Sequence, residues 1–243
     1  MKLYYNPIST YSQKVLIALY EKGLDFEPEI VNLMDPDARA QYREVYPMGK
    51  IPCLILDDGH MIPESSIIIE YIDPLAKPTL IKGDADETRR IRLKDRMFDL
   101  YLNDAVVTLL FQGMKPESEQ DPERIEKAKF HISTMYSFME NEFGQQPYAN
   151  GEEFLMGDCS AAPGLFYAEQ VAPFAEHKNI SAYWERLKSR PSIQRTHEEA
   201  APILAELIAK DAACKPVNRD SRGGPRSYRR APTGGLLRIK LRK

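Results

Sequence analysis

The sequence predicts an α/β domain followed by an all-helical domain. Before residue 77, short β-prone runs alternate with helical patterns, and an Asp-Gly pair between two apolar runs predicts a hairpin. After residue 85 the chain contains long helical patterns. The 243 residues, 43% hydrophobic and 28% charged, are typical of an ordinary globular protein and allow one large core or two smaller ones.

The first 77 residues give the element order β-α-β-α-β-β-α. The isoleucine run after Ser66 would suit a strand by itself, but the serines before it and Asp73-Pro74 after it favour a helix. The hairpin turn, residues 57–60, is expected to hold two residues with positive φ. Strands are expected at residues 2–5, 26–31, 53–56 and 61–62, and helices at residues 13–22, 35–45 and 67–72.

Residues 78–85 are expected to form a linker, and residues 86–209 the helical domain, with one long helix at 86–112 and another at 122–142. The tail, residues 210–243, holds eleven Lys or Arg and two Asp, a charge of +9, which leaves 22 basic and 34 acidic residues, or −12, in the body. A basic tail with few apolar residues predicts disorder. Binding to nucleic acid or a membrane surface is the alternative.

Several function classes are disfavoured. No apolar run approaches the length of about 20 residues that a membrane span needs, and the start MKLYYNPIST lacks the apolar segment of a secretory signal. Cys53, Cys159 and Cys214 form no CxxC pair, which argues against a disulfide framework or zinc site and fits a reducing cytosol. We expect Cys53 to be a small buried side chain, and the four scattered His residues predict no metal site.

The segment YPMGKIPCLIL places Pro52 where an apolar strand begins. Proline has no N–H for a sheet ladder and is excluded from central strands. A trans proline capping an edge strand and a cis proline fit the local sequence equally well.

In the β-α-β-α-β-β-α order, MGKIPCL and PESSIIIEYI resemble the N-terminal thioredoxin-like domain of the glutathione S-transferase superfamily. The resemblance covers residues 1–208 and implies a thioredoxin-like domain followed by an all-α C-terminal domain. Gly-Lys-Ile-Pro followed about a dozen residues later by Glu-Ser is the specific pairing. The chain is similar to bacterial, serine-site members of theta or zeta type, with the subclass left open.

The resemblance implies a glutathione site. It implies that Pro52 is cis and that the main chain of Ile51 faces outward, where the cysteinyl backbone of glutathione can pair with it. Glu64 and Ser65 would hold the γ-glutamyl carboxylate at a helix start, where unpaired N–H groups bind anions; Ser65 also suits a simple N-cap. Lys50 is a counter-charge for a ligand carboxylate or an ordinary solvated side chain.

Glutathione chemistry requires a thiolate, which a hydroxyl and a helix N-terminus can stabilise. By its position before VLIALYEKG, Ser9 falls where serine-type members keep their activating hydroxyl. Tyr5 falls where tyrosine-type members keep theirs, and Ser12 or Thr10 is the further alternative. No Cys lies at residues 9–12, so the mixed-disulfide chemistry of glutaredoxins is not expected.

In the helical half, residues 154–163 resemble the family's helix-capping segment, with Ser160 expected as N-cap and Pro163 in place of the usual acid. Arg89 and Arg92 lie on a solvated face or, as the resemblance implies, meet acidic groups across a dimer. Tyr183-Trp184 and Arg190-Pro191 fit the same C-terminal pattern.

These features together predict a cytoplasmic, homodimeric glutathione transferase that joins the glutathione thiolate to a small apolar electrophile. Glutathione is the co-substrate, and no metal, membrane or nucleic-acid partner is expected. A non-catalytic binding or regulatory member of the fold is one alternative, and a glutathione-dependent isomerase or dehalogenase is another. The residues expected to line the electrophile pocket are apolar or aromatic: Tyr11, Tyr101, Phe111 and Met114.

Overall fold

The computed structural model describes residues 1–144 and 146–214. Helix α9, Pro191–Cys214, runs past the predicted domain boundary at residue 209. The rest of the predicted basic tail, residues 215–243, lies outside the described residues.

A four-stranded mixed sheet forms the first domain, in the order β2-β1-β3-β4. Strand β1 pairs in parallel with β2, and β3 is antiparallel to both β1 and β4. The predicted element order is confirmed, although β2 is two residues shorter than expected. The strands are β1 Lys2–Tyr5, β2 Glu27–Ile30, β3 Cys53–Ile55 and β4 Met61–Pro63.

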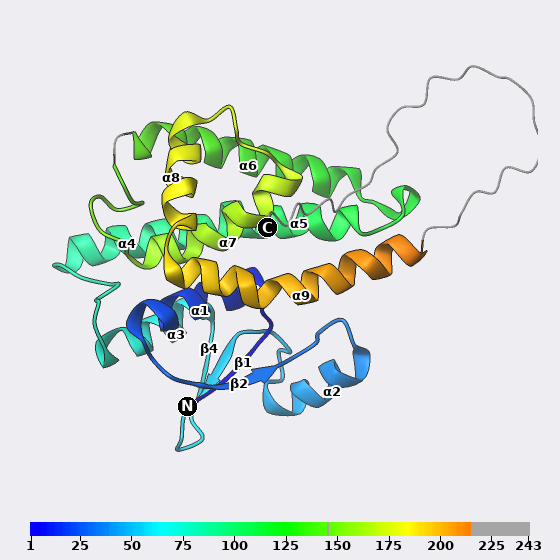
Figure 1. The fold of residues 1–243 in the computed structure, drawn as a ribbon, viewed down its shortest axis with the longest axis horizontal. Coiled ribbons are helices and arrows are strands. Elements are labelled where there is room, and N and C mark those ends of the chain that lie inside the picture. Colours follow the sequence, from blue (N-terminus) through cyan, green and yellow to red (C-terminus); the bar gives the residue numbers. More distant parts are fainter. Residues whose placement is uncertain (145, 215–243) are drawn as a thin grey trace, which may run out of the picture.

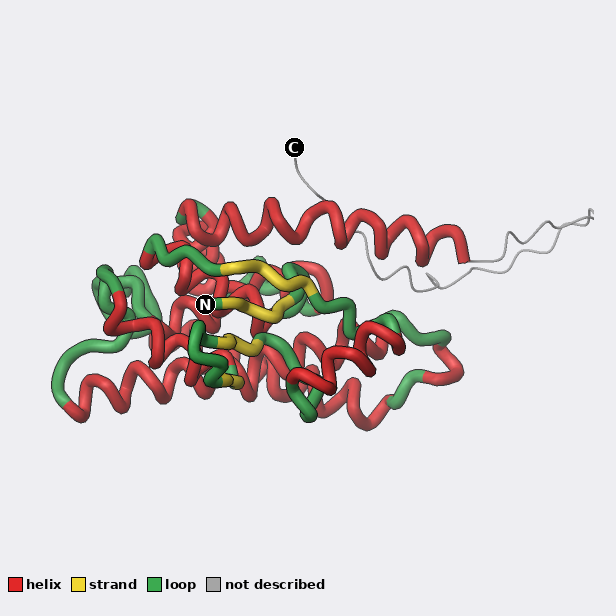
Figure 2. Tube along the Cα trace, turned by 90° about the horizontal axis from the view of Figure 1, so that it is seen from below, coloured by secondary structure: helices red, strands yellow, loops and turns green. Residues whose placement is uncertain are grey.

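Alternation along the strands gives the sheet two packed faces. Leu3, Leu54 and Ile62 pack into the main core with helices α1 (Thr10–Lys22) and α3 (Ser65–Ile72). The opposite face packs on helix α2, Pro36–Val45, in a smaller cluster around Val31, Tyr42 and Cys53. In Figure 1, α1 and α3 lie between the sheet and the helical domain. Figure 2 views the molecule from below, so these two helices do not hide the sheet.

The hairpin joining β3 to β4 is confirmed, but its turn differs from the one expected. Gly59 adopts a positive φ of 84°, whereas the φ of Asp58 is not positive. The Leu56 N–H donates to the His60 carbonyl at 2.9 Å, which closes a loop longer than two residues. A longer loop needs only one left-handed residue, and glycine supplies it.

The helical domain begins one residue before the predicted start, and its first long helix is interrupted. The prediction of a single helix over residues 86–112 is wrong, because a π-helical segment, Phe98–Asn103, separates α4 from α5. Such a segment inserts about one residue per turn and changes which side chains face a neighbour. The helices are α4 Ala85–Met97, α5 Asp104–Gly113, α6 Pro122–Phe143, α7 Met156–Val171, α8 Lys178–Lys188 and α9, with short 3₁₀ turns at Asp73–Leu75 and Glu117–Glu119.

The predicted cap of α7 is also wrong. The helix starts at Met156, so the N-cap position is Leu155, and Ser160 lies inside the helix. Asp158 at the third helical position accepts from the Leu155 N–H at 2.8 Å, from the Ala149 N–H at 2.9 Å and from the Tyr183 hydroxyl at 2.7 Å. Leucine has no side-chain acceptor, so only the acid's half of a capping box is present.

Helices α1 and α7 pack along each other, and α7 also packs on α4 and the π-helical segment, so the two domains share one continuous core. Among the described residues, no helix is both long and apolar enough to cross a membrane.

Candidate functional site

The predicted binding segments meet at one edge of the sheet. Because β3 is antiparallel to both β1 and β4, those two strands run in the same direction. Helices α1 and α3, which follow β1 and β4, therefore both begin at this edge. The amino end of β3, with Pro52 before it, lies at the same edge. Ser9, Ile51-Pro52 and Glu64-Ser65 thus come together although they are far apart in sequence.

Ser9 is the N-cap of α1. Its backbone is extended (φ −78°, ψ 125°) and its Oγ accepts from the Ser12 N–H at 3.4 Å. A hydroxyl accepts through a lone pair and keeps its own hydrogen for another partner. Ser9 is half-buried, so its hydroxyl can cap the helix and still donate to a ligand. The helix start adds partial positive charge at this position.

The other candidate hydroxyls, those of Ser12, Thr10 and Tyr5, belong to buried side chains. Ser12 is fully buried and its Oγ accepts from the Asn6 N–H at 3.2 Å; Thr10 is also buried. Tyr5 shares the α1 face of the sheet with Leu3, as strand alternation requires. Of these hydroxyl-bearing residues, Ser9 is half-buried, whereas Tyr5, Thr10 and Ser12 are buried.

Tyr5 lines a separate cavity of about 300 Å³ against the carboxyl-terminal half of α1. Its ring meets Phe26 edge-on, with centroids 6.0 Å apart. Burial raises the pKa of the Tyr5 phenol, and Glu199 raises it further. These surroundings favour a neutral phenol that packs against apolar groups.

The peptide bond between Ile51 and Pro52 is cis, as predicted. The Tyr42 hydroxyl donates to the Lys50 carbonyl at 2.8 Å and so holds the loop before it. Neither the N–H nor the carbonyl of Ile51 hydrogen-bonds to a described residue. Lys50 is exposed and forms no ion pair within the described chain. Both groups are free to meet a ligand.

The start of α3 offers unpaired donors. Glu64 has φ 68°, which is rare for a residue with a side chain and costs about 1–3 kcal/mol. Its side chain is exposed and makes no cap hydrogen bond, so the N–H groups of Ser65, Ser66 and Ile67 have no partner among the described residues. Strained backbone and open donors at a helix start are suited to binding an anion.

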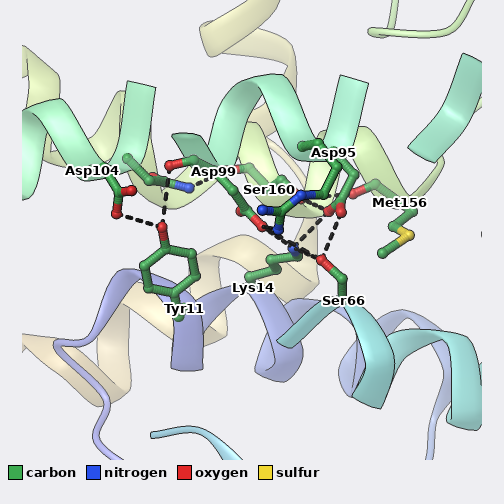
Figure 3. Close-up of polar contacts among 10 residues, drawn as sticks. Tyr11, Lys14, Ser66, Asp95, Asp99, Asp104, Met156 and Ser160 are labelled. Carbon is green, nitrogen blue, oxygen red and sulfur yellow. Dashed lines mark hydrogen bonds and ion pairs between the residues drawn. The ribbon is translucent and has the colours of Figure 1, made fainter. Parts of the chain in front are cut away.

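A buried ionic cluster lies directly behind this edge, and the sequence did not predict it (Figure 3). The Lys14 Nζ lies 2.6 Å from Asp95 Oδ1, 2.8 Å from Asp99 Oδ2 and 2.8 Å from the Ser66 Oγ. The Ser66 hydroxyl donates to Asp95 Oδ2 at 2.7 Å, and Ser160 donates to Asp95 as well. The cluster joins α1, α3, α4 and α7.

The buried part of the cluster holds more negative than positive charge. Lys14, Asp95 and Asp99 are all at most 2% exposed, so two carboxylates share one buried ammonium. Burial raises the pKa of Asp99, Lys14 lowers it and the neighbouring Asp95 raises it again. The Arg96 guanidinium lies 3.5 Å from Asp99 Oδ2 and adds a more exposed positive charge.

The first residue of α5, Asp104, adds a third carboxylate to this side, directly after the π-helical segment. The Asp104 N–H donates to the Asp99 carbonyl in the wider π turn. The Tyr11 hydroxyl lies 2.7 Å from Asp104 Oδ1 and 3.1 Å from the same Asp99 carbonyl. Tyr11 and Lys14, one turn apart on α1, therefore both attach the start of that helix to the helical domain (Figure 3).

The predicted pocket residues are partly accessible. Tyr101, Phe111 and Met114 are 45%, 52% and 46% exposed. The Tyr101 ring lies 5.9 Å from that of His131 on α6. Arg89 and Arg92 pair within the chain, with Asp86 at 2.6 Å and Glu70 at 2.8 Å.

Neither Cys53 nor Cys159 resembles a nucleophile. Cys53 is buried, as expected, and burial raises the pKa of its thiol to about 11, partly offset by Tyr42. Burial also raises the pKa of Cys159. Over the described residues, no group of three His, Cys, Asp or Glu is placed to hold a metal ion.

Comparison with known proteins gives the same assignment for both domains. The glutathione S-transferase N-terminal domain matches residues 3–79, and the glutathione S-transferase C-terminal domain matches residues 102–191. Glutathione S-transferase 2 of Saccharomyces cerevisiae is 28% identical over 209 residues, covering 82% of this chain and 90% of that protein. The stringent starvation protein A homolog of Coxiella burnetii is 26% identical, covering 85% of this chain and 96% of that protein.

A solved structure adds to these sequence matches. The glutathione S-transferase of Methylobacillus flagellatus, determined with GSH bound, superposes with a TM-score of 0.73 at 28% identity, covering 80% of this chain and 98% of that one. The mixed four-stranded sheet with its helical second domain agrees with this likeness. The chain belongs to the glutathione S-transferase superfamily.

Proposed function

We propose that this protein is a glutathione transferase whose site is the open sheet edge formed by Ser9, Ile51-Pro52 and Glu64-Ser65. The observation that carries the proposal is the meeting of three unsatisfied features there: a free hydroxyl hydrogen, an unpaired backbone segment and an unpaired helix start. Glutathione needs all three, because it is a short peptide with a carboxylate at its γ-glutamyl end and a thiol in the middle.

Each part of glutathione has a complementary group. The γ-glutamyl carboxylate accepts from the N–H groups at the start of α3 and from the Ser65 hydroxyl. The cysteinyl backbone pairs with Ile51 as an added strand. The Lys50 ammonium stands as a counter-charge for a ligand carboxylate, and the Ser9 hydroxyl donates to the sulfur.

The reaction we propose is nucleophilic attack by sulfur. The thiol proton passes to solvent, and the Ser9 hydroxyl with the α1 N-terminus stabilises the thiolate that remains. A sulfur lone pair then forms a C–S bond with the electrophile, and the displaced group leaves with the electrons of the bond that breaks. No protein nucleophile takes part.

We place the electrophile against Tyr11 and the exposed apolar side chains Tyr101, Phe111 and Met114, which suits small apolar molecules. We also propose a cytoplasmic homodimer. The homodimer is supported by exposed apolar side chains on α3, α4 and the π-helical segment: Ile67, Tyr71, Leu93 and Leu100.

The second candidate is a non-catalytic member of the superfamily, and the relative from Coxiella burnetii carries the name of a stringent starvation protein rather than that of a transferase. A glutathione-dependent isomerase or dehalogenase would use the same groups. Calorimetry with glutathione, run beside a panel of chlorinated arenes, haloalkanes and unsaturated carbonyl compounds, separates these cases. Binding with turnover of one class supports the proposal. Binding without any turnover favours the non-catalytic candidate, and absence of binding contradicts the proposed site.

A further inference from the structure

The loop that carries Ser9 is tied down on every side. The Gln13 Nε2 donates to the Pro7 carbonyl at 2.8 Å, and the Ser9 N–H donates to the Asn6 carbonyl at 2.9 Å. Between them, the Ile8 carbonyl accepts from the Tyr167 hydroxyl at 2.7 Å. Three consecutive peptide units before α1 are therefore fixed by hydrogen bonds.

The donor to Ile8 comes from the other domain. Tyr167 lies on α7, 159 residues further along the chain, and is only 4% exposed. Burial raises the pKa of its phenol, and the neighbouring Gln13 side chain offsets part of that rise. A phenol that stays neutral keeps the hydrogen it donates.

The bond has a direct geometric consequence for Ser9. The Ile8 carbonyl and the Ser9 N–H belong to one planar peptide unit. Because Tyr167 fixes its oxygen and Asn6 fixes its nitrogen, the plane cannot turn, and the Cα of Ser9 has a set position. The rotations of Ser9 that remain are φ and ψ, which the start of α1 holds at −78° and 125°, and χ1, which directs the hydroxyl.

We propose that Tyr167 is a positioning residue for the reaction, which fixes the Ile8–Ser9 peptide so that the Ser9 hydroxyl points at the sulfur of bound glutathione. This inference rests on the proposed function. Through Tyr167 the helical domain contributes to the chemistry of the thioredoxin-like domain, in addition to holding the electrophile. Small displacements of a reacting group carry large rate costs, which gives such a bond its value.

A purely structural role predicts something different. A buried tyrosine that only supports packing would change stability when its hydroxyl is removed and leave the thiol of bound glutathione as it was. The described chain offers a matched control in Tyr136, which is 5% exposed and donates to the Ala172 carbonyl at 2.6 Å, away from Ser9.

The test compares Tyr167→Phe with Tyr136→Phe in the full-length protein. Thiolate absorbance is titrated against pH with glutathione bound, and kcat and glutathione KM are measured near neutral pH with an electrophile that the wild type turns over. For Tyr167→Phe we expect kcat to fall about three- to tenfold, the bound thiol pKa to rise by about 0.5 to 1, and KM to stay within about twofold. Tyr136→Phe should change none of these.

A double-variant cycle decides whether Tyr167 acts through Ser9. In a Ser9→Ala background, Tyr167→Phe should have no further effect on the thiol pKa. An equal effect in both backgrounds, or no effect in either, would overturn the inference. Gln13→Met loosens the same loop from the other side and should act in the same direction. Absence of a bound thiolate in the wild type would overturn both the proposed function and this inference. A thiol pKa that changes in Ser9→Ala but not in Tyr167→Phe would overturn only the inference.

Discussion

Two groups of polar side chains meet near the start of helix α1, and they differ in what surrounds them. At the sheet edge, Ser9 is half-buried, Glu64 and Lys50 are exposed, and several backbone donors have no partner within the described chain. One turn further along, Lys14 and its two aspartates are buried and paired with one another. The first group has unused hydrogen-bonding capacity and the second has almost none, so the first is suited to binding a ligand and the second to joining domains.

The largest expected effect tests that difference with two lysines. Lys14→Met should lower the free energy of unfolding by about 3–5 kcal/mol, because it leaves two buried carboxylates without their ammonium. Lys50→Met, at an exposed position, should change it by less than about 0.5 kcal/mol. Urea unfolding of both variants measures this. Equal losses of unfolding free energy in the two variants would contradict the proposed difference between the buried and the exposed group.

A pH effect should come from another buried carboxylate of the helical domain. Burial raises the pKa of Asp158 to about 6, although hydrogen bonds from Ala149, Leu155 and Tyr183 oppose the shift. Between about pH 4 and pH 6 the folded state therefore holds a proton that the unfolded state has released. The resulting contribution of Asp158 to the free energy of unfolding, about 2–3 kcal/mol, is present below about pH 4 and is lost as the pH rises through about 6.

Asp158→Asn removes that titration. The free energy of unfolding of the wild type, measured relative to that of Asp158→Asn, should therefore fall between pH 4 and pH 7. A difference that stays constant over this range would show that Asp158 remains ionised in the folded state, held so by its three donors.

At the open edge, Ser65→Ala should weaken glutathione binding by about 1.5–3 kcal/mol, since the lost hydrogen bond is to a charged carboxylate. Calorimetry measures the affinity. Ser66→Ala is the matched control: its hydroxyl belongs to the buried cluster, so it should affect unfolding more than binding. Unchanged affinity in Ser65→Ala would remove the start of α3 from the proposed site.

The smallest effect is expected from Tyr5→Phe. Its hydroxyl makes no hydrogen bond with a described residue, and its side chain lines the cavity against the carboxyl-terminal half of α1. Turnover with glutathione should stay within about twofold of wild type. A loss of tenfold or more would transfer the activating role from Ser9 to Tyr5.

The open edge was predictable because short motifs define it. A proline at the mouth of a strand, a Glu-Ser pair before an apolar helix and a serine before another helix each constrain the local backbone. The hairpin and the element order follow from the same kind of local pattern. For Tyr5, the position at a strand end did not reveal which face of the sheet its side chain occupies.

The buried interface was not predictable from such patterns. Lys14 meets aspartates more than 80 residues away and Tyr167 meets Ile8 across 159 residues, contacts that exist only after the domains dock. The π turn at Phe98–Asn103 adds only about one residue to a long helical pattern, so the sequence was interpreted as one continuous helix. Leu155 occupies an N-cap position that polar residues normally fill, and so the prediction shifted to Ser160.

The most direct test of the account is a pH titration of the thiol of bound glutathione in the wild type and in Ser9→Ala. A charge-assisted hydrogen bond to the thiolate is worth roughly 1.5–3 kcal/mol, so its loss should raise the thiol pKa by about one to two units and cut turnover near neutral pH roughly ten- to a hundredfold. Glutathione affinity should barely change, and the loss of turnover should shrink as the pH rises. A thiol pKa that is the same in both proteins would contradict the central claim that Ser9 stabilises the thiolate.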